Sequence, residues 1–373
     1  MPHIFVPMPS STLRRVAAPL VAAALLATAA SCASIGGTLT APAEHTVITK
    51  AKDLRPDKPY LSEDGDKPGM LIGPHYKLAV SGYTATTEVP EDNARVYGFD
   101  QPMAVPDDSE FFLAIMDGKS QVHSNEKVKA ELTVNDKKRP LDRLPGPSEA
   151  IAAVIPAKAD VKLTVTDEEK SQTINLRDGK RSEQIDGYYN GGLESDDPVD
   201  YDSKGKITAD AGAQYEKEKR TLNISMKVGA ATKAPWIESK GWADKGKVWV
   251  SVPISDMTTD SVYGFAPGSH EPGVDWTLKE RELFSLNPNE GKATDSKGKE
   301  SFKADQSSQT TDGTSSLFSP SEVTLLFQVS DKTTKAELKI SPRGKMKAVW
   351  ANVTGSCSWN DKPSAKEISL AFK

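Results

Sequence analysis

Tryptophan is the residue type in this chain that is best suited to binding, and all six copies lie in the second half. Exposed indole rings stack on sugars or anchor protein partners. Trp249 and Trp350 lie within apolar runs, so we expect them in a core. Trp236, Trp242 and Trp359 lie in loop-like sequence rich in Gly, Pro, Asn and Asp. These three are the candidate binding residues.

Catalytic and metal-binding motifs have little support. The histidines are few and no pair has the usual spacing of metal ligands, so we predict no metal site and no cofactor. The segment 200–211 begins like a calcium loop, but Lys204 stands at its fifth position and Ala211 at its twelfth, where a glutamate is needed. No G-x-S-x-G elbow or glycine-rich phosphate loop occurs, so we predict no catalytic residue.

The N-terminus has the pattern of a secretory signal peptide over residues 1–31. Arg14 and Arg15 precede an apolar run, and small residues follow it. The run is too short and too rich in alanine for a membrane-spanning helix. Cys32 stands where a bacterial lipoprotein carries its acylated cysteine, so we expect lipidation there and attachment to the cell membrane. Ala29 replaces the usual leucine of that pattern, and ordinary cleavage, giving a secreted protein, is the alternative.

The remaining composition bounds the protein class. If Cys32 is acylated or removed, Cys357 has no intramolecular partner, and we expect a small buried hydrophobic residue. A disulfide between the two is the alternative. With 27% charged residues and a net charge of −5, the chain is mildly acidic. Because nucleic-acid binding relies on Lys and Arg meeting phosphates, we predict no nucleic-acid partner.

The second half of the chain repeats landmarks of the first half in the same order. Regularly spaced landmarks of this kind indicate a duplicated domain. The pairs are Val96-Tyr-Gly-Phe99 with Val262-Tyr-Gly-Phe265, Pro147-Ser-Glu149 with Pro320-Ser-Glu322, and the alternating runs 161–166 and 336–341.

Short strands separated by Gly, Pro, Asp or Asn predict an all-β protein made of two tandem β-sandwiches. After the signal peptide we predict a flexible tether, an acidic linker between the sandwiches, and a polar loop or extended hairpin within the second one. The predicted bounds are 32–69 for the tether, 70–181 for the first sandwich, 182–220 for the linker, 221–373 for the second sandwich and 287–315 for the polar loop.

A family resemblance accompanies this pattern. The run Ser319-Pro-Ser-Glu322, Leu325–Val329 and Ala336–Ile340 resembles the immunoglobulin-like, telokin-like domains of secreted lipoproteins of the Gram-positive, actinobacterial type. Pro147–Val165 echoes the same pattern in the first repeat. The resemblance implies an extracellular, immunoglobulin-like β-sandwich in each repeat. It implies no catalytic residues.

The function that these features favour is non-catalytic. We expect a lipid-anchored envelope protein that binds or scaffolds an envelope component or a partner protein. One alternative is a module that binds cell-wall glycan through the tryptophans of the C-terminal domain; an enzyme acting on envelope polymers is another. The tryptophans and the insert 341–365 occur only in the second repeat, so we expect function there.

Overall fold

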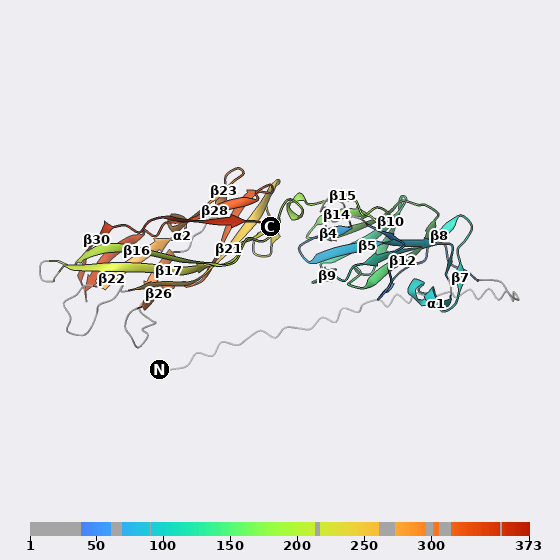
Figure 1. Ribbon diagram of the computed structural model, residues 1–373, viewed down its shortest axis with the longest axis horizontal. Helices are drawn as coiled ribbons and strands as arrows, with labels where there is room; N and C mark the ends of the chain where they lie inside the picture. Colours follow the sequence, from blue (N-terminus) through green and yellow to red (C-terminus); the bar gives the residue numbers. More distant parts are fainter. Residues whose placement is uncertain are drawn as a thin grey trace, which may run out of the picture. The chain divides into compact units, whose positions relative to one another are not determined.

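The computed structural model describes residues 39–60, 69–89, 91–124, 126–212, 217–260, 273–295, 301–305, 315–350 and 353–373. Strands make up 59% and helices 5% of the structure, which confirms the predicted all-β sandwich class. The two sandwiches follow each other along the chain (Figure 1). No helix in the described part of the chain is long and apolar enough to cross a membrane.

The first sandwich consists of two antiparallel sheets that face each other. One sheet has the order β2 (Thr46–Lys50), β12 (Glu149–Pro156), β8 (Ser109–Met116), β5 (Tyr76–Thr86) and β3 (Lys58–Pro59), with β4 (Met70–Ile72) and β9 (Gln121–Val122) also paired to β5. The other has the order β11 (Lys137–Leu141), β10 (Val128–Val134), β13 (Val161–Asp167), β14 (Lys170–Asn175) and β15 (Arg181–Glu183).

The core of this sandwich follows from alternation along its strands. Val161, Leu163 and Val165 of β13 are fully buried between the sheets, whereas the intervening side chains lie towards solvent. In β8 and β12 almost every residue is buried. These two strands are therefore covered on both faces, which explains their continuous apolar sequence.

The segment that contains the first Val-Tyr-Gly-Phe word covers the outer faces of β8 and β12. It includes α1 (Glu91–Ala94), η1 (Arg95–Tyr97) and the strands β6 (Glu88–Val89) and β7 (Met103–Ala104). The rings of Tyr97 and Phe99 contact Phe111 of β8 with centroids 5.4 and 5.8 Å apart. Gly98 has a φ of 78°, in the left-handed region that favours glycine. The first copy of the word is thus a structural cover; the second copy lies outside the described residues.

The second sandwich contains a sheet whose strand pairing closes on itself. From β21 (Lys247–Asp260) the hydrogen-bonded path runs through β17, β16, β30, β29, β22, β25 and β26 and returns to β21. The bounds are β16 (Val199–Asp210), β17 (Glu218–Val228), β22 (Gly273–Lys279), β25 (Ser301–Asp305), β26 (Ser315–Ser319), β29 (Lys345–Trp350) and β30 (Val353–Asp361). Trp276, Phe302 and Phe318 are buried in its core.

The rest of the second sandwich packs on the first part of β21. β27 (Val323–Ser330), β24 (Thr294–Asp295) and β18 (Thr232–Ala234) extend that sheet. A separate sheet has the order β23 (Phe284–Pro288), β28 (Lys335–Ile340) and β31 (Lys366–Ala371), and α2 (Glu280–Leu283) precedes β23. Leu338 of β28 and Val250 of β21 belong to one buried apolar cluster.

Equivalent strand connections support the duplication. In the first sandwich β12 pairs with β8, and the chain then crosses to β13, which lies between β10 and β14. In the second, β27 pairs with β21, and the chain crosses to β28, which lies between β23 and β31. The insert 341–365 supplies β29 and β30, which help to close the sheet around the core.

Two predicted boundaries differ from the structure. The tether 32–69 contains β2 and β3, which pair with β12 and β5, so the first sandwich begins well before residue 70. The linker 182–220 contains β16, and the second sandwich therefore begins before residue 221. The polar segment 287–315, for which a loop or an extended hairpin was predicted, contains β25, which pairs with β26 as a hairpin and buries Phe302.

The physical reason for the linker error is visible in β16. Tyr201, Ile207 and Ala209 are fully buried, while Asp200 and Asp202 lie exposed on the opposite face. The acids are thus the solvent face of a strand, and their number hid its period of two. A strand also lacks the turn that a calcium loop needs.

Candidate functional site

Two of the predicted binding residues form one small hairpin. β19 (Trp236–Ile237) pairs with β20 (Gly241–Trp242), and Trp236 lies directly opposite Trp242. Gly241, the first residue of β20, has a φ of 75°, in the left-handed region that favours glycine. Both indoles are partly buried, and the hairpin therefore presents two aromatic side chains from adjacent strands.

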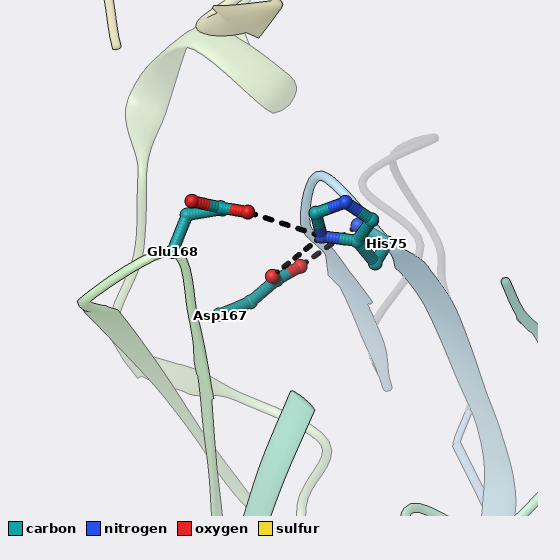
Figure 2. Close-up of side chains that lie close together, drawn as sticks. All are labelled: His75, Asp167 and Glu168. Carbon is teal, nitrogen blue, oxygen red and sulfur yellow. Dashed lines mark hydrogen bonds and ion pairs between the residues drawn. The ribbon is translucent and has the colours of Figure 1, made fainter. Parts of the chain in front are cut away.

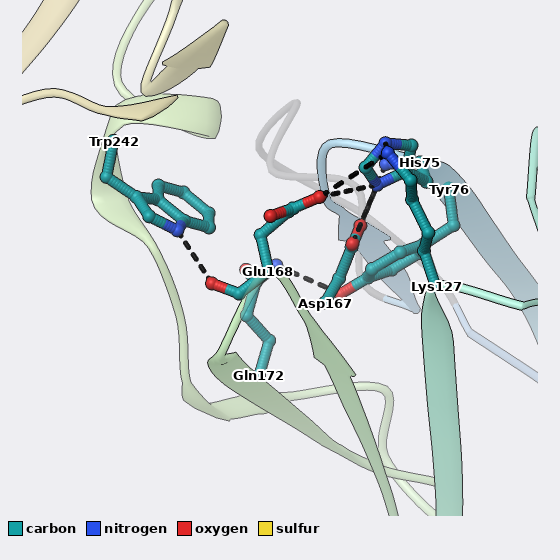
Figure 3. A network of polar contacts seen from close by, with 7 residues as sticks. All are labelled: His75, Tyr76, Lys127, Asp167, Glu168, Gln172 and Trp242. Atoms are coloured by element: carbon teal, nitrogen blue, oxygen red, sulfur yellow. Dashed lines mark hydrogen bonds and ion pairs between the residues drawn. The ribbon is translucent and has the colours of Figure 1, made fainter. Parts of the chain in front are cut away.

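The hairpin contacts the first sandwich through both indoles. Nε1 of Trp242 donates a 2.7 Å hydrogen bond to the backbone oxygen of Glu168, as Figure 3 shows. The Lys170 ammonium lies 4.1 Å from the centroid of the Trp242 ring. The Trp236 ring meets His75 edge to face, with centroids 5.2 Å apart. These two tryptophans therefore hold residues of the first sandwich.

Trp359 has different surroundings. Its ring packs against Trp276 with centroids 5.6 Å apart, and its Nε1 donates a 3.1 Å hydrogen bond to the Arg343 carbonyl. It lies on β30 and packs against the core of the second sandwich. Trp236 and Trp242 thus lie side by side in the hairpin, whereas Trp359 lies in the closed sheet.

An open cleft of about 610 Å³ lies beside Trp242. The first sandwich lines it with Lys170 and Ser171 at the start of β14, followed by the segment 184–187. The second lines it with Pro235, the loop from Trp242 to Lys247, and Asp331. Clefts that combine an aromatic ring with a few charged groups are typical binding sites.

The charges in this cleft are mixed. Lys247 pairs with Asp244 at 3.2 Å, whereas Lys170 and Lys245 have no acidic partner within 4 Å among the described residues. Desolvation lowers the pKa of Lys170, whose ammonium lies over the Trp242 ring. Two cations without an acidic partner are thus available to a ligand.

Gln172 holds one wall of the cleft in place. Its buried amide donates to the Tyr76 hydroxyl at 3.0 Å and to the Ile72 carbonyl at 2.7 Å. Its oxygen accepts from the backbone N–H of Ile185, a residue of the wall, and from the Tyr189 hydroxyl. Every polar atom of this side chain is engaged, which makes the wall rigid.

A second polar group is centred on His75 (Figure 2), whose ring contacts Trp236 of the hairpin. The carboxylate of Asp167 accepts 2.8 Å hydrogen bonds from the ring Nδ1 and the backbone N–H of His75. Glu168 Oε1 lies 3.9 Å from the same Nδ1, and Lys127 Nζ lies 3.3 Å from His75 Nε2. The side chains of His75, Asp167 and Glu168 are close enough together to hold a metal ion.

The turn that carries Glu168 has an unusual backbone. Glu168 and Glu169 connect β13 to β14 with φ angles of 45° and 65°. The left-handed region costs a residue other than glycine about 1–2 kcal/mol. Glu168 makes two tertiary contacts from this strained turn. Its carbonyl accepts a hydrogen bond from Trp242, and its carboxylate faces His75.

Sequence reasoning missed this group because its members come from distant strands. His75 lies 92 residues before Asp167, between β4 and β5. Two consecutive acids in a short hairpin connection were the available signal, and such acids are usually solvated.

The structure describes one of the two cysteines. Cys32 lies outside the described residues. Cys357 is partly buried on β30, and burial raises the pKa of its thiol to about 11. A thiol of that pKa is almost wholly protonated at neutral pH, so it is a poor nucleophile.

No protein-family model, no curated protein and no solved structure matches this chain.

Proposed function

We propose that this protein is a non-catalytic, lipid-anchored protein of the cell envelope that binds a partner protein or another envelope component. The observation that carries the proposal is the cleft beside Trp242, to which both sandwiches contribute charged side chains. A central aromatic residue with surrounding polar groups is the usual composition of a binding hot spot.

The His75 group supports a non-catalytic role. His75 Nε2, the atom that a general base would use, faces the Lys127 ammonium at 3.3 Å. Both oxygens of Asp167 accept from His75, and that carboxylate is buried. The described residues of this group thus bond mainly to one another, as in a structural network.

The binding proposal is tested with the soluble chain that lacks residues 1–32. Immobilised on beads, it should capture a component of envelope extract. Trp242→Ala and Lys245→Glu should each reduce capture, the tryptophan change by about tenfold or more if Trp242 is a hot spot. Lys292→Glu is the matched control, since Lys292 is exposed and does not line the cleft. Equal capture by all four proteins would refute the cleft as the binding site.

Glycan binding is a second candidate function, and Trp242 is the observation that favours it. An indole in an open cleft suits stacking against a sugar ring. Trp236 and Trp359 are not among the residues that line the cleft, so the glycan proposal now rests on Trp242. Purified cell-wall glycan should retain the wild-type protein and release Trp242→Ala at lower salt or lower glycan density. Retention of neither protein would reject this candidate.

Lipid anchoring at Cys32 needs its own experiment. Two acyl chains bind a membrane far more firmly than one. Cys32→Ala should therefore release the protein into the medium, while Cys357→Ala should leave it with the membrane fraction. Membrane retention of Cys32→Ala would refute anchoring at that residue.

A further inference from the structure

We propose that His75, Asp167 and Glu168 form a binding site for a divalent transition-metal cation. Nδ1 of His75 lies 2.8 Å from Asp167 Oδ1 and 3.9 Å from Glu168 Oε1. The three ligand atoms all lie within 4.8 Å of one another. Two ligand atoms that each lie about 2.0–2.2 Å from one cation are at most about 4.4 Å apart, so the separations of 2.8 and 3.9 Å from Nδ1 are compatible with a shared ion.

The three side chains point to one place because their backbones are held there. Asp167 is the last residue of β13 and is 2% exposed. Its Oδ2 accepts the backbone N–H of His75, which fixes the carboxylate relative to the imidazole. The carbonyl of His75 accepts a 2.8 Å hydrogen bond from the backbone N–H of His123. Figure 2 shows the ring and both carboxylates converging from these two segments.

The donor set selects the class of cation. One imidazole nitrogen and two carboxylate oxygens suit Zn²⁺, Co²⁺ or Mn²⁺, whereas Ca²⁺ and Mg²⁺ prefer oxygen ligands alone. Three protein ligands leave coordination positions for water. Binding needs the lone pair of Nδ1, so the single proton of the neutral imidazole moves from Nδ1 to Nε2 by exchange with solvent, and the ring itself releases no net proton.

Lys127 is the natural competitor of this cation. Its Nζ lies 3.3 Å from His75 Nε2 and 3.7 Å from Glu168 Oε1. The metal-bound imidazole would direct an N–H towards that ammonium, so Lys127 must move aside. Its side chain is 48% exposed and is free to turn into water. Removing this positive charge should therefore tighten metal binding.

The neighbouring indole supplies a direct readout. The Trp236 ring centroid lies 5.2 Å from that of His75, and a paramagnetic ion such as Co²⁺ bound there should quench the Trp236 fluorescence. Figure 3 shows Glu168 between the site and Trp242, so a bound cation would also brace the turn behind the cleft. The site goes beyond the proposed binding function and does not depend on the ligand of the cleft.

The test uses the chain that begins at residue 33, which retains the compact unit Thr40–Lys373. After treatment with a chelator, the protein is titrated with Co²⁺, followed by visible absorption and tryptophan fluorescence. We expect one saturable site with quenching, and displacement of Co²⁺ by Zn²⁺. His75→Gln and Glu168→Gln should each weaken binding by about tenfold or more. Lys127→Met should strengthen it.

Matched controls separate this site from adventitious binding. His123→Gln and Glu169→Gln change exposed side chains next to the site and should leave Co²⁺ binding unaltered. Trp236→Phe should bind Co²⁺ with an unchanged visible spectrum and reduced quenching. Absence of saturable binding by the wild type would overturn the proposal. So would equal affinities for the wild type, His75→Gln and Glu168→Gln, with folding checked by circular dichroism.

Discussion

The indole Nε1 of Trp242 donates a hydrogen bond to the backbone carbonyl of Glu168, 74 residues earlier in the chain and on the other sandwich. Glu168 is the first residue of the strained β13–β14 turn, and its carboxylate faces His75. This one bond therefore links the Trp236–Trp242 hairpin, the cleft and the His75 group. It makes Trp242 a structural residue as well as a candidate binding residue.

Trp242→Phe keeps an aromatic ring but removes the donor to Glu168. We expect the free energy of unfolding to fall by about 0.5–1.5 kcal/mol, the usual net contribution of such a hydrogen bond. Urea denaturation followed by circular dichroism measures the change. Trp359→Phe is the comparison, since its Nε1 bond to Arg343 is solvent-exposed and should contribute less. A larger loss in Trp359→Phe would contradict this assignment.

Lys233 provides a second test of stability. This 2% exposed side chain donates 2.9 Å hydrogen bonds to the carbonyls of Asn190 and Thr333. Lys233→Met leaves both carbonyls without that donor, so we expect a loss of about 2–4 kcal/mol in thermal or urea unfolding. Lys227→Met on the exposed face of β17 should cost less than about 0.5 kcal/mol. Similar losses in the two variants would argue against a structural role for Lys233.

The same lysine should show a pH signature. Burial lowers the pKa of Lys233. Between the lowered folded-state pKa and the unfolded value of about 10.4, the unfolded chain binds the proton more tightly, so stability rises with pH in that window. The free energy of unfolding of the wild type should therefore increase relative to that of Lys233→Met as the pH rises. A constant difference across the window would show that the ammonium is not desolvated.

Gly98 tests the structural role of the first Val-Tyr-Gly-Phe word. Its φ is 78°, and an added Cβ would lie 3.0 Å from Val47 Cγ1. Gly98→Ala should therefore destabilise the protein by about 1–2 kcal/mol. Gly118→Ala is the matched control, because an added Cβ there meets nothing within 4 Å. Equal thermal midpoints for the two variants would contradict the strain argument.

Buried tyrosines predict alkaline unfolding. Burial raises the pKa of Tyr97 and of Tyr189 to about 12. Above pH 10 the unfolded chain loses phenolic protons that the folded chain keeps, so stability falls from about pH 10 to 12, by up to about 1.4 kcal/mol per pH unit for each tyrosine. Ultraviolet absorbance of tyrosinate should rise together with unfolding. Tyr97→Phe should reduce the loss of stability between pH 10 and 12. Ionisation of both Tyr97 and Tyr189 near pH 10 in the folded protein would contradict this prediction.

Local pattern was sufficient for much of the fold. The alternation of Val161, Leu163 and Val165 identified a strand with one buried face, and all three are buried in the structure. The apolar run around Trp249 indicated a core position, and Trp249 is buried. These features depend on neighbours within one strand, where a period of two is directly visible.

Polar strands escaped the same reasoning. β16 carries acids on its solvent face and a few buried side chains on the other, and its composition is that of a linker. β2 looked like part of a tether, yet the backbone of Ile48 pairs with Ile151 of β12. A backbone hydrogen bond needs no particular side chain, so pairing of this kind leaves little trace in composition.

The sequence by itself determined the all-β class, the duplicated strand pattern and the buried faces, because each follows from short-range alternation and turn chemistry. The tertiary structure alone decided which distant residues meet. It placed His75 beside Asp167, 92 residues apart, brought Trp242 to Glu168, and closed the sheet of the second sandwich through strands of the insert. Such contacts depend on how sheets pack and on strand register, which no single segment of the chain encodes.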